Sequence, residues 1–130
     1  MKPRKKERIG DFIEVQIAPA VYAYCRLATN MACVFYNFTS EAPIQTTSLL
    51  ADKRLLVGLY VMAYATREGH WRIIDQAPLP PEVDELTTQP SFLRRGVNSP
   101  MTAEHTLREL LAVKGYEDLN PNFPWQDWFE

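Results

Sequence analysis

Apolar and polar residues between residues 10 and 38 alternate with the period of two that is typical of half-buried β-strands. In residues 11–17, one face of the predicted strand carries Ile13, Val15 and Ile17. Residues 21–28 follow the same alternation, whereas residues 31–38 are apolar on both faces apart from Asn37. The pattern therefore predicts three successive strands, with the third inside the sheet because both of its faces need cover.

The connection between the second and third strands has the composition of a two-residue hairpin turn. Residues 29–30 are a threonine and an asparagine, and asparagine tolerates the positive φ that such turns need. This register places Cys25 opposite Val34 and Cys33 opposite Arg26. The two cysteine side chains are therefore expected on opposite faces of the sheet. Both are expected to be free, buried thiols, since they also lack the spacing of metal ligands.

Two further segments have strand patterns. Residues 55–65 are apolar on both sides and rich in β-branched and aromatic residues, and Gly58 within them indicates a bend. A turn leads into residues 71–76, and the two segments are expected to form a hairpin. Residues 92–95 can add a short edge strand. The predicted fold class is mostly β (α+β), with a strongly bent antiparallel five- to six-stranded sheet or an SH3-like barrel.

The C-terminal third contains the one helix that the sequence predicts. Prolines between residues 78 and 90 indicate an extended segment in which no helix forms. A C-terminal helix is then expected over about residues 102–114, with either Ser99 before Pro100 or Thr102 as its N-terminal cap. Its apolar stripe consists of Ala103, Leu107, Leu110 and Leu111.

The last residues form an aromatic and acidic tail. Residues 115–130 contain five aromatic side chains, and residues 116–130 contain four carboxylates and no cation. The aromatic side chains either fold back over the open face of the sheet or form an exposed patch for a partner. In the second case the expected partner-binding residues are Asp127, Trp128 and Glu130. Trp125 is expected to pack against the sheet.

Length and composition favour a single domain. The 130 residues are 46% hydrophobic, which is enough to bury a core without disulfide bonds or structural metals. Residues 1–9 form a basic arm, with five cations and one carboxylate among its first eight residues, before a β-rich domain over residues 10–130. The net charge of −2 argues against a strongly basic nucleic-acid binder, and no apolar run approaches the ~20 residues of a membrane helix. The cytoplasm is the expected location.

The sequence contains no motif that points to catalysis or to a cofactor. The two histidines, His70 and His105, have no glycine-flanked serine or cysteine motif beside them. The five glycines form no phosphate-binding loop, and no paired histidine or cysteine ligands are present. No enzyme activity, cofactor or metal is therefore expected.

Four short motifs along the chain suggest a family. They are IGDFI at residues 9–13, YAYCRL at 22–27, GHWRII at 69–74 and the Pro-Leu pair at 78–79. Together they resemble the immunity protein 26 family over about residues 9–93. Members of that family are antitoxin proteins encoded beside bacterial polymorphic toxins, and they are mostly β with a characteristic tryptophan.

The resemblance implies a protein that neutralises a cognate toxin by stoichiometric binding, without catalysis. It implies that Gly10 and Asp11 form the turn that starts the sheet and that Trp71 is the family's tryptophan. It implies an exposed or barrel-lining aromatic face with Tyr22 and Tyr24, which join the tail residues as expected partner-binding residues. An acidic inhibitor suits a basic nuclease toxin. The alternative is a small β-barrel interaction module that binds another protein or nucleic acid.

Overall fold

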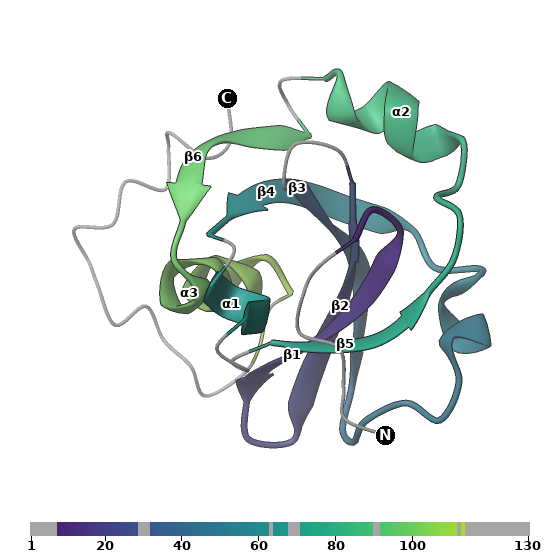
Figure 1. Ribbon diagram of the computed structural model, residues 1–130. Coiled ribbons are helices and arrows are strands. Elements are labelled where there is room, and N and C mark those ends of the chain that lie inside the picture. Colours follow the sequence, from purple (N-terminus) through teal and green to yellow (C-terminus); the bar gives the residue numbers. More distant parts are fainter. Residues whose placement is uncertain are drawn as a thin grey trace.

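The computed structural model describes residues 8–28, 32–62, 64–67, 71–89, 92–111 and 113. Within this part of the chain, six strands form one sheet in the order β5-β1-β2-β3-β4-β6 (Figure 1). The strands are β1 (Asp11–Ala18), β2 (Val21–Leu27), β3 (Ala32–Ser40), β4 (Leu55–Val61), β5 (Arg72–Gln76) and β6 (Leu93–Asn98). The helices are the 3-10 turn η2 (Thr47–Leu50), α1 (Tyr64–Arg67), α2 (Glu82–Thr87) and α3 (Pro100–Leu110).

The sheet is strongly bent and open. Neighbouring strands from β5 to β4 are antiparallel, whereas β6 runs parallel to β4. Strands β5 and β6 lie at the two ends of the strand order and do not pair with each other in the described part of the chain. The predicted bent, mostly β sheet is therefore confirmed, and it is an open sheet rather than a closed barrel. Strand β3 lies inside the sheet, as its apolar faces predicted.

The predicted hairpin between residues 55–65 and 71–76 is wrong. Strand β4 ends at Val61, the short helix α1 follows, and β5 pairs with β1 at the other end of the sheet. In that pairing Ile73 lies opposite Ile13. The reason is that β4 is already flanked by β3 and β6, so that it has no edge left for β5.

The helices also differ from the sequence pattern. Helix α2 forms within the proline-rich segment because Pro81 occupies its N-cap, where the missing N–H has no helical acceptor to lose. Helix α3 begins with the first of the two predicted caps, since the Ser99 hydroxyl accepts a hydrogen bond from the Thr102 N–H at 3.2 Å and Pro100 follows. The helix ends at Leu110, earlier than predicted.

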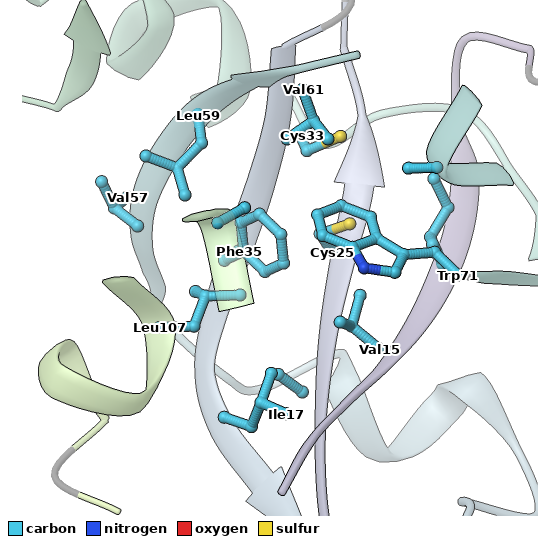
Figure 2. Close-up of a cluster of buried hydrophobic side chains, with 14 of the residues drawn as sticks. Val15, Ile17, Cys25, Cys33, Phe35, Val57, Leu59, Val61, Trp71 and Leu107 are labelled. Carbon is cyan, nitrogen blue, oxygen red and sulfur yellow. The ribbon is translucent and has the colours of Figure 1, made fainter. Parts of the chain in front are cut away.

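Both faces of the sheet are covered. One face buries the apolar set of β1 against Trp71 and against Ala103 and Leu107 of α3 (Figure 2). On the opposite face, Tyr24 is buried together with Leu50 of η2, and a further cluster there includes Val83 of α2. Figure 1 shows α3 on the inside of the curved sheet and α2 outside it. The alternation along β1 therefore separates two buried layers rather than a core face and a solvent face.

The register of the β2–β3 hairpin differs by one residue from the prediction. Leu27 pairs with Cys33, and the Ala28 N–H donates to the Ala32 carbonyl at 2.8 Å, so the connection has three residues. A shift of one residue moves side chains to the other face of a strand. Cys25 and Cys33 consequently share one core cluster, and the prediction of opposite faces is wrong (Figure 2). Both are buried, free thiols, as expected.

Candidate partner-binding site

A row of polar side chains crosses three neighbouring strands on the sheet face opposite α3. Glu14 of β1 pairs in register with Tyr24 of β2 on one side and with Arg72 of β5 on the other. The Tyr24 hydroxyl donates to Glu14 Oε2 at 2.9 Å, and Arg72 Nη2 lies 2.7 Å from Glu14 Oε1. The Glu14 carboxylate is buried, and its partner Arg72 is 58% exposed in its side chain. In this row the buried negative charge of Glu14 is therefore paired with the exposed positive charge of Arg72.

Tyr24 also holds the segment that follows β3. Its hydroxyl accepts a hydrogen bond from the Ile44 N–H at 3.1 Å and lies 3.0 Å from the Ser40 hydroxyl. Burial raises the pKa of the Tyr24 phenol above its ordinary value. Because Tyr24 is fully buried whereas Tyr22 is half-buried, Tyr22 is the one of the two that a partner can reach.

Gly10 and Asp11 form the turn that opens β1. Gly10 has a φ of +92°, and a Cβ there would collide with the Ala77 carbonyl oxygen, so only glycine fits. The buried Asp11 carboxylate accepts a hydrogen bond from the Arg8 N–H at 2.6 Å. The turn is therefore fixed both by backbone conformation and by a side chain.

Arg26, a residue to which the sequence pattern assigned no role, braces the same turn. The residue is 3% exposed, and its guanidinium donates to the carbonyl oxygens of Gly10, Ala77 and Pro78 at 2.5 to 3.3 Å. It also lies 3.8 Å above the centre of the Phe12 ring. The signal in the sequence is a single arginine within an otherwise apolar strand, because a buried charge needs dedicated partners.

Trp71 joins the start of β5 to α3. The indole ring is 2% exposed and meets Phe35 edge-on, with ring centres 5.8 Å apart (Figure 2). Its Nε1–H donates to Glu104 Oε2 at 2.9 Å. Trp71 is therefore the core residue that the sequence predicted, and its polar edge is used within the protein.

A cavity of about 450 Å³ lies between the sheet, the η2 segment and the segment that leads into α2. Its lining includes Phe12, Arg26 and Lys53.

Among the described residues, no three histidine, cysteine, aspartate or glutamate side chains are grouped so as to hold a metal ion. No helix in the described part of the chain is long and apolar enough to cross a membrane.

The Gly10 turn, the buried Trp71 and the six strands of the sheet all lie within the region that a family model matches. The family model described as Immunity protein 26 matches residues 8–101. The chain belongs to the immunity protein 26 family. No curated protein and no solved structure matches it.

The family match separates the expected site residues into two groups. The match includes Gly10, Asp11, Tyr22, Tyr24 and Trp71, all of which the structure describes. The tail lies beyond the matched region, and Asp127, Trp128 and Glu130 fall outside the described residues, as does His70. His105 lies half-buried on α3. Of the matched residues, Asp11 lies in β1, and Tyr22 and Tyr24 lie in β2. Gly10 lies in the turn directly before β1, and Trp71 directly precedes β5.

Proposed function

We propose that this protein neutralises a cognate bacterial toxin of a polymorphic toxin system by binding it stoichiometrically in the cytoplasm, without catalysis. The observation that carries the proposal is the match of the immunity protein 26 family model to residues 8–101. An inhibitor of this kind acts through affinity and electrostatic fit rather than through turnover.

The bonding of the sheet supports this role. Glu14, Tyr24 and Arg26 are buried and engaged in hydrogen bonds within the protein. Groups held in this way fix the shape of the surface above them. A fixed shape lowers the entropy that is lost on binding, which favours tight complexes.

The surface that we propose for the toxin combines Tyr22 with the tail residues Asp127, Trp128 and Glu130. Aromatic side chains that become fully desolvated supply much of the affinity at protein interfaces. The acidic tail accelerates association with a basic partner, for which a basic nuclease is the proposed class of toxin.

Deletion of residues 126–130 tests the tail directly. The truncated protein should keep its circular dichroism spectrum and melting temperature while its affinity for the toxin encoded beside its gene falls. The association rate of the full chain should also fall with added salt, because exposed charges are screened. Asp127→Asn should lower the association rate, whereas the matched change Asp118→Asn in the same tail should have a smaller effect.

Two outcomes would contradict this surface. A large loss of stability on truncation would mean that the tail covers the sheet instead of the toxin. An intact fold with undiminished affinity would remove the tail from the interface. Binding to nucleic acid, with no association with the toxin, would favour the alternative of an interaction module of another class.

A further inference from the structure

The cavity of about 450 Å³ has a size that suits a side chain or a small organic molecule. It lies on the sheet face opposite α3, and its floor is apolar, with Phe12, Tyr36 and Leu50 all buried. Its rim comes from the segment around η2 and from the start of α2. Apolar floors with a few polar groups at one end are typical of ligand sites.

Arg26 supplies a buried positive charge to the cavity lining. Its Nε and Nη2 atoms bond the backbone carbonyls that brace the first turn, whereas Nη1 has no hydrogen bond among the described residues. Neither the Lys53–Asp52 nor the Arg72–Glu14 ion pair includes Arg26. A guanidinium carries five N–H donors, so Arg26 keeps donor capacity for an anion.

Asp75 is a carboxylate near Arg26, but it accepts hydrogen bonds from other residues. Asp75 and Arg26 both pair in register with Phe12. Hydrogen bonds from the Gln76 N–H and the Thr47 hydroxyl lower the pKa of Asp75, with a smaller contribution from the charge of Arg26. Asp75 is exposed, and its oxygens already accept these two bonds.

Lys53 supplies a second positive charge at the rim. Its Nζ atom lies 3.7 Å from a carboxylate oxygen of Asp52, whose side chain is 84% exposed, so this pair is weakly held. Thr46 and Ser48 also line the cavity, and their hydroxyl oxygens lie 3.1 Å from each other. Glu82 is the carboxylate residue of the lining, and it is exposed.

We propose that this cavity binds a carboxylate group carried on a short apolar stem. The stem would lie on the floor of Phe12, Tyr36 and Leu50, and the carboxylate would meet Arg26 and Lys53. A glutamate or aspartate side chain of the toxin is one source of such a group, which rests on the proposed function. A free carboxylic acid is the other source.

Titration of the free protein with sodium butanoate tests the chemistry, because butanoate is a carboxylate on a short apolar stem. Two-dimensional ¹H–¹⁵N spectra should show saturable shifts of the Arg26 Nε–H signal and of the Thr47, Ser48 and Ala51 amides. Butylammonium chloride at the same ionic strength has the same stem with the opposite charge, and it should produce no saturable shift.

Variants at the rim make the test specific for charge in the cavity. Lys53→Gln should weaken butanoate binding by about threefold or more, which is within the range of a partly exposed ion pair. Arg54→Gln removes the same charge from the next residue, which is exposed and does not line the cavity, and should leave the affinity unchanged. Glu82→Gln should tighten binding because it removes a repelling carboxylate. Absence of saturable shifts, or equal losses in the lysine and arginine variants, would overturn the proposal.

Affinity for the toxin distinguishes the two sources of the carboxylate. If the toxin supplies it, Lys53→Gln should raise the Kd for the toxin, and saturating butanoate should compete with the toxin. If a free acid is the ligand, toxin affinity should be the same in both proteins and insensitive to butanoate. Because the butanoate titration needs no toxin, its failure would leave toxin neutralisation untouched, and failure of neutralisation would leave the butanoate result standing.

Discussion

Replacement of Trp71 by alanine should be among the most destabilising single changes in this protein. The indole is 2% exposed and packs edge-on against Phe35, with ring centres 5.8 Å apart. Truncation of a buried aromatic side chain to alanine costs about 3 to 5 kcal/mol, from lost transfer free energy and the cavity left behind. Since the whole free energy of unfolding is about 5 to 15 kcal/mol, this is a large share.

Changes at Glu104 separate the ring from its hydrogen bond. Glu104→Ala leaves the ring in place but removes the acceptor of the Trp71 Nε1–H. Loss of this charge-assisted bond should cost about 1 to 2 kcal/mol, and Glu104→Gln, which keeps an oxygen acceptor, should cost less. In the Trp71→Ala background Glu104→Ala should cost almost nothing, because the two residues then no longer interact.

Urea denaturation followed by far-ultraviolet circular dichroism measures the wild type and the four variants without relying on tryptophan fluorescence. The Trp71→Ala midpoint should fall with little change in the slope of the transition. An unchanged midpoint together with lost toxin binding would refute the reasoning. It would mean that Trp71 is a platform for the partner instead of a core residue.

Three further predictions concern the turn, the polar row and the thiols. Gly10→Ala should lower the free energy of unfolding in urea by about 2 kcal/mol or more, since φ is positive and Ala77 blocks a Cβ; an unchanged value would contradict this. Burial raises the pKa of Tyr24 in the fold, so the stability that it contributes is complete below the unfolded pKa of about 10 and is lost as pH rises further. Thermal melts from about pH 8 to about pH 11 should show a steeper alkaline loss for wild type than for Tyr24→Phe, and parallel curves would count against it. Thiol titration should find two free thiols after denaturation without reductant, with slow reaction in the native protein because burial raises the pKa of Cys25; zero thiols in a monomer would contradict a free Cys25 and Cys33.

The strands were predictable because their pattern is local, whereas their pairing is not. The alternation along residues 11–17 located β1, and the apolar residues of 31–38 located β3. The same apolar character hid the register of β3, since a strand with two apolar faces gives no sign of which face is which. The sequence pattern was therefore compatible with a β2–β3 connection of either two or three residues.

The turn residues before β5 likewise predicted that the chain reverses direction, but they did not show which strand β5 then pairs with. Strand β6, which follows β5 in sequence, occupies the edge of β4 that a hairpin would have used. Pairings between distant segments depend on such competition, which local patterns do not record.

The candidate site was predictable only in part for the same reason. The sequence located Gly10, Asp11 and Trp71 through their motifs. The partners of Glu14 and Arg26 include Arg72 and Ala77, which are about 50 or more residues away in the chain. Buried polar groups of this kind become interpretable only when the topology is known.

Titration of toxin activity with the purified protein is the most direct test of the proposed neutralisation. The activity of the toxin encoded beside the gene should fall linearly with added protein and reach zero at a fixed ratio of the two proteins that does not change with incubation time. Loss of toxin activity at far smaller amounts, growing with time, would indicate catalytic inactivation. Full toxin activity in excess protein would contradict neutralisation altogether.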